Sequence, residues 1–221
     1  MIDLRREGGV HVLRLDDGEN RFTPDLLDGL SAALDEVTKT AGPRALVLTG
    51  TGKFFSAGLD LDRVMSDGDG LGPYIDRVHG LFARLLTLPM PTVAALNGHV
   101  VAAGAMLSLT CDYRVMRADR GYFMLPEVDL GLPFTPGMSA LIQSRLPAAT
   151  AHEAMVTGRR YGGEEAVSAG IVHQAAAEPE VVSAAIALAE PLAAKDGDTI
   201  ARIRTGMYQP VLDALGRPFT L

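Results

Sequence analysis

The sequence has no tryptophan and only one cysteine, Cys111. A single cysteine excludes a disulfide framework within the chain and is typical of a protein of the reducing cytoplasm. Because Cys111 lies in an apolar segment, we expect a buried thiol without a catalytic role. Basic residues are also few, and the net charge of -7 argues against general binding of nucleic acid. We expect the basic pair Arg159–Arg160 to form a solvated turn.

We also expect no membrane-spanning segment and no targeting signal. A spanning helix needs about 20 predominantly apolar residues. The hydrophobic stretch 93–109 is broken by asparagine, histidine and glycine, so it is expected to be buried core. The first residues lack the apolar segment of a signal peptide, and the last three do not match a peroxisomal signal. We therefore expect a cytoplasmic protein with no membrane partner.

Hydrophobic periodicity predicts strands and helices that alternate at first, and mainly helices after Glu127. The expected strands are 10–15, 45–49, 92–96 and 112–116, with a short one at Ile171–Val172. The expected helices are 24–39, 74–88, 102–109, 136–146, 150–157, 163–169, 180–194 and 198–215. Residues 66–73 read as a mobile surface loop. This order predicts an α/β fold with a core over residues 1–177 and a helical C-terminal region over residues 178–221.

Several common catalytic patterns are absent. The segment Gly50-Thr51-Gly52-Lys53 lacks the first glycine and the final hydroxyl of a phosphate-binding loop. No strand leads into Ser139, and its surroundings do not match a nucleophilic serine. The histidines show no spacing typical of metal ligands. We therefore expect neither a metal nor a nucleophilic serine.

Glu127 lies in the apolar segment 123–134. Burial disfavours the charged carboxylate and raises its pKa toward neutrality, where the group can both accept and return a proton. An acidic residue in a solvated turn is the simpler interpretation of the same pattern. The choice between the two depends on the rest of the chain.

Two other segments, 53–61 and 97–104, follow buried strands and pass through small residues. Where a helix begins, backbone N–H groups are unpaired and carry partial positive charge. Two such groups at one pocket would stabilise a developing oxyanion, and small side chains would let a carbonyl substrate reach them. Small residues near helix starts also serve packing, so spacing alone leaves both interpretations open.

Taken in order, five motifs resemble the enoyl-CoA hydratase/isomerase (crotonase) superfamily. They are Phe55-Ser56-Ala57-Gly58-Leu59-Asp60-Leu61, Asn97-Gly98-His99-Val100-Val101-Ala102-Ala103-Gly104, Cys111-Asp112-Tyr113-Arg114, Pro126-Glu127-Val128-Asp129-Leu130-Gly131 and the segment 158–172. The resemblance implies a spiral of ββα units whose helical C-terminal region forms homotrimers or dimers of trimers. It also implies an acyl-CoA thioester as substrate, with coenzyme A as part of that substrate and no separate cofactor.

The same resemblance implies a set of site residues. The thioester carbonyl is expected between the peptide N–H groups of Ala57 and Ala103, opposite the catalytic Glu127. The expected coenzyme A and acyl contacts are Phe22, Ser56, Ala57, Gly58, Leu59, Asp60, Leu61, Gly104, Pro126 and Leu130. For Asp60, a helix cap is an equal alternative. Lys53 is a candidate phosphate contact, and the loop 65–74 is expected to shape the acyl pocket.

Hydratases of this superfamily use two glutamates, and Met106 stands where one of them would be. A single carboxylate suits proton transfer between two carbons, so the resemblance favours a Δ3,Δ2-enoyl-CoA isomerase of fatty acid metabolism. Met106, Leu130, Leu132 and Phe134 would exclude water, although each is equally well explained as ordinary core. The alternatives are a hydratase, a catalytically silent acyl-CoA-binding subunit, and dehalogenase or decarboxylase chemistry on the same fold.

Overall fold

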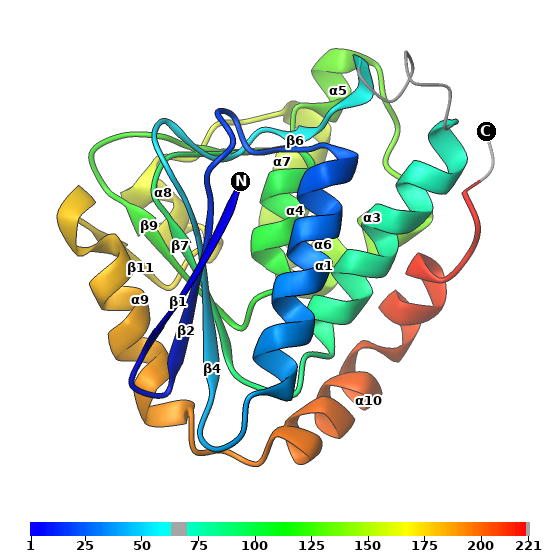
Figure 1. Ribbon diagram of the computed structural model, residues 1–221. Helices are drawn as coiled ribbons and strands as arrows, with labels where there is room; N and C mark the ends of the chain where they lie inside the picture. The colour runs from blue at the N-terminus through cyan, green and yellow to red at the C-terminus, as the bar shows by residue number, and fades with distance from the viewer. Residues whose placement is uncertain (63–69, 220–221) are drawn as a thin grey trace.

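A six-stranded sheet forms the centre of the molecule in the computed structural model, which describes residues 1–62 and 70–219 (Figure 1). Its order is β1 (Ile2–Glu7), β2 (Val10–Leu15), β4 (Ala45–Gly50), β7 (Thr92–Leu96), β9 (Tyr113–Arg117) and β11 (Gln174–Ala176). Strands β1 and β2 are antiparallel, and all other neighbours are parallel. Parallel neighbours need long crossovers, which the helices of the chain supply.

Two smaller sheets lie beside the large one. One has the order β10 (Phe123–Met124), β8 (His99–Val101) and β5 (Phe54–Ser56), and the other pairs β3 (Arg21–Phe22) with β6 (Gly58–Leu59). Four times along the chain, a strand of the large sheet is followed by one strand of a small sheet, or by two after β4, and then by a helix. The structure thus has the repeated ββα order that the sequence resemblance implies.

The helices begin and end largely where the sequence predicts. They are α1 (Pro24–Lys39), α3 (Leu71–Leu86), α4 (Ala103–Leu109), α5 (Glu127–Leu130), α6 (Pro136–Arg145), α7 (Ala148–Thr157), α8 (Gly163–Ser168), α9 (Val181–Ala189) and α10 (Gly197–Leu215), with 3-10 turns at Glu178–Glu180 and Glu190–Leu192. Helix α1 shows why the prediction works. The Thr23 side chain accepts the N–H of Leu26 at 3.1 Å, and Pro24 occupies the first turn.

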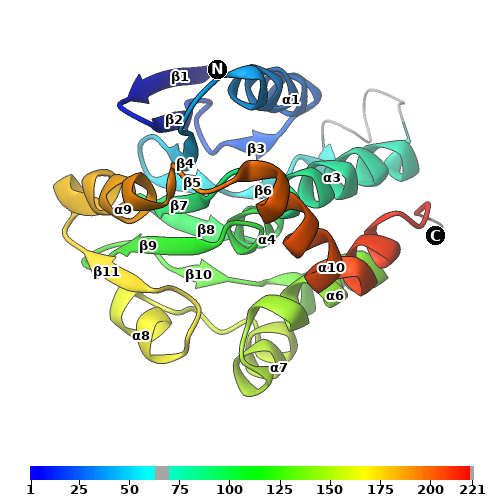
Figure 2. The ribbon, with the colours of Figure 1, turned by 90° about the horizontal axis from the view of Figure 1, so that it is seen from below.

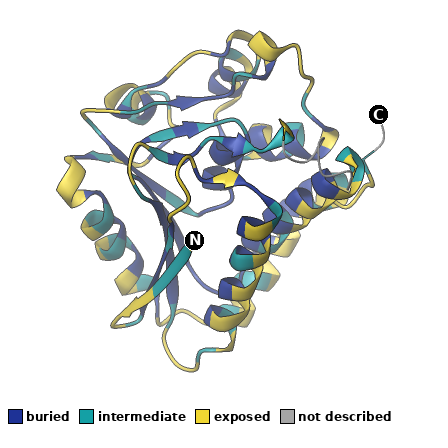
Figure 3. Ribbon diagram, turned by 45° about the horizontal axis from the view of Figure 1, so that its top comes forward, coloured by how far each residue is buried: buried dark blue, intermediate teal, exposed yellow. Residues whose placement is uncertain are grey.

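Both faces of the large sheet are covered. Along β4, Leu46 and Leu48 face the main core, whereas Ala45 and Val47 face a second core beneath α9. Figure 2 shows α9 on one side of the sheet and α1, α3 and α4 on the other. Figure 3 shows the central strands of the sheet buried between these layers, whereas the edge strand β1 is half-buried to exposed. A strand covered on both faces is apolar throughout, and for this reason β4 is a continuous hydrophobic run.

Two sequence predictions need correction here. Ile171 and Val172 do not form a strand, because both N–H groups donate to the Ala166 carbonyl, at 2.8 and 3.1 Å, and close the end of α8. The strand follows at Gln174–Ala176. Of the predicted loop 66–73, residues 66–69 lie outside the described residues, and 71–73 form the first turn of α3.

The C-terminal helices pack on the rest of the chain. Helix α9 contributes Val181, Ala185 and Ala189 to the second core, and α10 contributes Tyr208 and Leu215 to the main core. The division at residue 177 and the role of this region in trimers stay predictions. Over residues 1–62 and 70–219, no helix has the length and apolarity needed to cross a membrane.

Candidate active site

The candidate site lies at one edge of the three-stranded sheet. Strands β5, β8 and β10 are parallel, with Ser56 beside Val100 and with Met124 beside Val101. Parallel strands end at the same edge of a sheet, so the segments that follow them are brought together. These segments contain Ala57, Ala103 and Glu127. The topology therefore gathers the three predicted catalytic positions from residues up to 70 apart in sequence.

Glu127 is the first residue of the short helix α5, and only 9% of its surface is exposed. Within the described residues, its buried Oε2 has no hydrogen-bond partner. Burial raises the pKa of Glu127 to about 7 from its ordinary value of 4.5. An unpaired buried carboxyl is costly for the fold, and its retention is typical of a group with a chemical role. The sequence prediction of a buried, proton-exchanging carboxyl is confirmed in its burial and in the direction of its pKa.

Ala103 begins helix α4, so its N–H lies in the first turn and has no partner within the helix. The preceding Ala102 has φ 52° and ψ -126°, a conformation that L-residues rarely adopt. Its own N–H donates to the Met124 carbonyl at 3.0 Å. Such backbone strain costs about 1–3 kcal/mol and is concentrated at functional sites. Here the strained residue orients the first peptide of α4.

Two glycines permit the backbone segments to approach closely. A Cβ at Gly58, which has φ 90°, would lie 2.8 Å from the Ala103 nitrogen. A Cβ at Gly104 would lie 2.4 Å from the Ser56 carbonyl oxygen. Gly58 therefore lets the loop 57–60 pack against the first peptide of α4, whereas Gly104 lets α4 pack on β5. Packing explains why residue 104 is glycine, and its predicted ligand contact stays a prediction.

The predicted donor at Ala57 needs correction. Its N–H donates to the Glu19 carbonyl at 2.9 Å, so it is already occupied. The N–H of Gly58 donates to the Ser56 hydroxyl at 3.1 Å, and that of Asp60 to the Tyr74 hydroxyl at 3.0 Å. Three of the N–H groups of residues 57–60 thus have partners outside the β3–β6 ladder. The fourth belongs to Leu59, which lies in β6 beside Phe22 of β3, and we take it as the candidate donor.

Asn20 holds this loop in place, and the sequence prediction missed it. Its side-chain nitrogen donates to the carbonyls of Phe54 and Phe55, both at 3.1 Å. Its own carbonyl accepts the Ser56 hydroxyl at 2.7 Å. Asn20 is fully buried with φ 51°, a conformation that asparagine tolerates better than most residues. An asparagine after the Asp17-Gly18 turn was the available sequence signal.

Other predicted contacts differ in their surroundings. Phe22 is fully buried and packs edge-on against Phe82, so its side chain has no exposed surface for a ligand in this structure. Ser56 is also fully buried. Leu130 and Leu132 are 62% and 44% exposed, so the interpretation of them as ordinary core is wrong for the single chain, and their role in excluding water stays a prediction. Leu130 is the last residue of α5, and Leu132 follows the turn at Gly131.

The remaining predicted positions divide by exposure. Met106 is buried, with 1% of its surface exposed. Five others are half-buried: Leu59, Asp60, Leu61, Pro126 and Phe134. Lys53 is exposed, with its ammonium 5.5 Å from the centre of the Phe54 ring. For all of these positions, contact with a ligand stays a prediction.

Cys111 matches its prediction. It is buried, and burial raises the pKa of its thiol to about 11, which keeps it protonated and unreactive at neutral pH. Arg159 and Arg160 are exposed, as predicted. The guanidinium of Arg159 pairs with Glu153 at 3.0 Å and with Glu165 at 3.4 Å.

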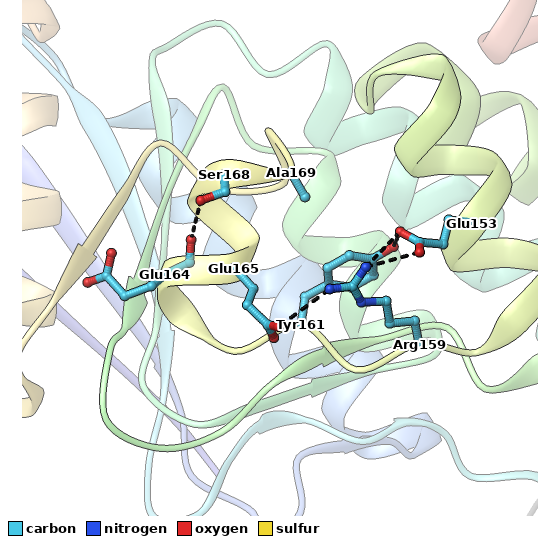
Figure 4. Close-up of a pocket in the computed structure, with 7 residues that line it drawn as sticks. All are labelled: Glu153, Arg159, Tyr161, Glu164, Glu165, Ser168 and Ala169. Atoms are coloured by element: carbon cyan, nitrogen blue, oxygen red, sulfur yellow. Dashed lines mark hydrogen bonds and ion pairs between the residues drawn. The ribbon is translucent and has the colours of Figure 1, made fainter.

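These ion pairs line a cavity of about 370 Å³ between α7 and α8 (Figure 4). Tyr161 also donates to Glu153 there, at 2.8 Å. None of the predicted site residues lines this cavity. Arg159, Glu153 and Glu165 pair with one another, so we interpret the cavity as the surface of an ion-pair network.

A buried carboxyl with a pKa near neutrality, close to backbone donors, suits acid–base catalysis on a carbonyl compound. The model of the enoyl-CoA hydratase/isomerase family matches residues 5–220. The peroxisomal enoyl-CoA delta isomerase 2 of Arabidopsis thaliana is 40% identical over 98% of this chain and 95% of its own length. Enoyl-CoA delta isomerase 3 of the same plant is 40% identical over 94% and 92%.

Among solved structures, a probable enoyl-CoA hydratase from Mycobacterium tuberculosis is similar throughout. Its TM-score is 0.88, with 28% identity over 97% of this chain and 91% of that chain. The sequence match and the shared fold lead to the same assignment. The chain belongs to the enoyl-CoA hydratase/isomerase family.

Proposed function

We propose that the protein is an isomerase that converts 3-enoyl-CoA to 2-enoyl-CoA. The observation that carries the proposal is Glu127, a buried carboxyl with an unpaired oxygen and a pKa near 7. Two relatives at 40% identity over nearly the full chain are named enoyl-CoA delta isomerases, which supports the same reaction. Coenzyme A is part of the substrate, and the reaction needs no redox cofactor because it only moves a double bond.

In this mechanism Glu127 accepts a proton from C2 of the bound thioester. The electrons of that C–H bond delocalise into a dienolate whose negative charge lies on the thioester oxygen. The same carboxyl then returns the proton to C4, and the double bond moves from C3–C4 to C2–C3. A pKa near 7 makes both protonation states accessible at neutral pH, which a shuttle requires.

The dienolate oxygen is held by two peptide N–H groups in this proposal. Ala103 supplies one from the first turn of α4, and Leu59 supplies the other in place of the predicted Ala57. Each donor of this kind typically contributes about 10²–10³ in rate. The close approach of Gly58 to the Ala103 nitrogen brings the loop 57–60 beside the first turn of α4, which supports two donors at one site.

Met106 distinguishes this proposal from hydration. It is 1% exposed and offers no carboxylate to hold a water molecule, so it favours proton transfer within the substrate. Hydratase activity is kept as the second candidate because a relative from Thermus thermophilus, 39% identical over 92% of this chain and 81% of its own length, is named a putative enoyl-CoA hydratase. Trimer formation and a cytoplasmic location remain proposals from the family resemblance and from the single cysteine. The name of the Arabidopsis relative places that protein in the peroxisome.

The test is a conjugation assay with 3-enoyl-CoA of several chain lengths, read by the ultraviolet absorbance of the conjugated thioester. We expect turnover by the wild type, and we expect Glu127→Gln to lower kcat by about 10²–10⁴, the range for a positioned acid–base group. The control is Glu164→Gln, a change at an exposed carboxyl of α8 that should leave kcat unchanged.

Three outcomes contradict the proposal. Unchanged turnover by Glu127→Gln removes the proton shuttle. Binding of thioester without turnover of any enoyl-CoA favours a silent subunit. Faster hydration of 2-enoyl-CoA than isomerisation of 3-enoyl-CoA favours the hydratase.

A further inference from the structure

Tyr74 connects the candidate site to helix α3. It lies in the first turn of that helix, and 3% of its surface is exposed. Its hydroxyl donates to the Phe22 carbonyl at 2.8 Å and accepts the N–H of Asp60 at 3.0 Å. Burial raises the pKa of Tyr74 to about 12, so the hydroxyl remains a neutral donor and acceptor. Both of its bonds go to backbone groups next to the proposed oxyanion donor.

The two strands that Tyr74 connects form a ladder that is too short to be stable without further contacts. Strands β3 and β6 pair over only two residues each, with Phe22 beside Leu59. A ladder this short has little stability of its own. Tyr74 binds one backbone group at each strand and so closes the end of the ladder.

The peptide between Leu59 and Asp60 is held at both ends. Its N–H, on Asp60, donates to Tyr74, and its carbonyl, on Leu59, accepts the Arg21 guanidinium at 3.4 Å. Fixing this peptide restricts the backbone torsions of Leu59. The adjacent peptide, which carries the Leu59 N–H, is thereby restrained as well, because the two share the Leu59 Cα.

We propose that Tyr74 is a positioning residue that sets the orientation of the Leu59 peptide and so the strength of the oxyanion site. This inference rests on the proposed isomerase function. The hydroxyl does not touch the substrate but acts through the Leu59–Asp60 backbone. Its loss should therefore reduce carbonyl polarisation and kcat more than it reduces binding of coenzyme A.

The experiment compares wild type, Tyr74→Phe and Tyr161→Phe. Tyr161 is a matched control, because it is equally buried and its hydroxyl donates to Glu153 at 2.8 Å, on α7. The probe is 2,4-hexadienoyl-CoA, whose absorbance moves to longer wavelength when hydrogen bonds polarise its carbonyl. For Tyr74→Phe we expect a smaller shift of the bound probe, a kcat about tenfold lower, and a Kd within about threefold of wild type. Tyr161→Phe should match the wild type in all three.

An equal wavelength shift and kcat in Tyr74→Phe would overturn the positioning role, provided that the wild type is active. If the wild type itself neither isomerises 3-enoyl-CoA nor shifts the probe, the proposed function fails instead. A second test uses the wild type alone, so that its result does not depend on whether Tyr74→Phe folds. Amide hydrogen exchange of the wild type should find Asp60 protected, and fast exchange at Asp60 would refute the inferred clamp.

Discussion

At the scale of single residues, Glu127 determines how activity depends on pH. Only the carboxylate form can accept the C2 proton. The pKa of Glu127 is raised to about 7, so this form is lost as pH falls below 7. We expect kcat/KM to be constant above this pH and to fall tenfold per pH unit below it. A profile measured from pH 5 to 9 checks this, and a midpoint near the ordinary value of 4.5 would contradict it.

The same carboxyl should reduce stability at high pH. Between pH 4.5 and 7 the folded protein holds a proton on Glu127 that the unfolded chain has released. The free energy of unfolding therefore falls as pH rises through this window, by about 3 kcal/mol in total. Glu127→Gln should lack this fall and should be the more stable protein at pH 8. Urea unfolding at pH 5 and pH 8 measures the difference, with Glu164→Gln as the surface control.

At the residue scale, the sequence predicted those properties of a side chain that depend on its neighbours in the chain. The apolar neighbours of Glu127 correctly indicated burial, and those of Cys111 indicated an inert thiol. The donor at Ala57 was wrong, because the use of its N–H depends on Glu19, 38 residues earlier in the chain. Asn20 was missed for the same reason, since its partners Phe54 and Phe55 are 34 and 35 residues away.

At the scale of elements, the turn at Gly58 carries a testable role. Gly58→Ala places a Cβ 2.8 Å from the Ala103 nitrogen and forces a side chain into φ 90°. We expect kcat to fall by about 10²-fold because the added methyl group pushes the loop 57–60 away from the first peptide of α4 and so separates the two proposed donors. Gly52→Ala is the matched control: its φ of 65° is also unfavourable, but no atom lies within 4 Å.

Both variants should lose about 1–2 kcal/mol of stability from the backbone alone. Only Gly58→Ala should lose activity in the conjugation assay at a temperature where both are folded. Equal kcat in the two variants would show that the close approach of the loop to Ala103 is not needed for catalysis.

Long elements were predictable and short ones were not. Helix α1 and strand β7 match their predicted limits, since periodicity and caps extend over several residues. Strands β3, β6 and β10 contain two residues each and carry no period that a sequence could reveal. They exist because parallel neighbours supply partners from distant segments. The candidate site lies at the ends of such short strands. Its motifs could be found by their resemblance to a family, but the geometry of the site could not be predicted from the sequence.

At the scale of the whole molecule, helix α10 is tied to the centre of the fold by Arg204. This side chain is buried, pairs with Asp112, and donates to the Leu88 and Met90 carbonyls at 2.6 and 3.0 Å. Asp112 also accepts the N–H of Thr92, at the start of β7. The C-terminal helix is thereby joined to the large sheet by a network of charge-assisted hydrogen bonds.

Removing the charge of Asp112 should loosen this connection. Asp112→Asn leaves the buried Arg204 guanidinium without its counter-charge, and we expect a loss of about 3 kcal/mol in the free energy of unfolding. The control is Asp213→Asn, at an exposed carboxylate of helix α10. It should change the free energy of unfolding by less than about 0.5 kcal/mol. Urea denaturation followed by circular dichroism measures both, and equal midpoints would contradict the role of the network.

The parallel pairing of the short strands has a consequence for biosynthesis. The candidate site draws on Asn20, the loop 54–60, Ala103 and Glu127, and each pair of neighbours is separated by at least one complete helix or strand. None of these contacts forms within a single hairpin, so loop closure over long stretches of chain must come first. On the ribosome, no partial chain that ends before residue 127 holds the site. The candidate site of a nascent chain is complete only after β10, the last strand of the three-stranded sheet, has paired with β8.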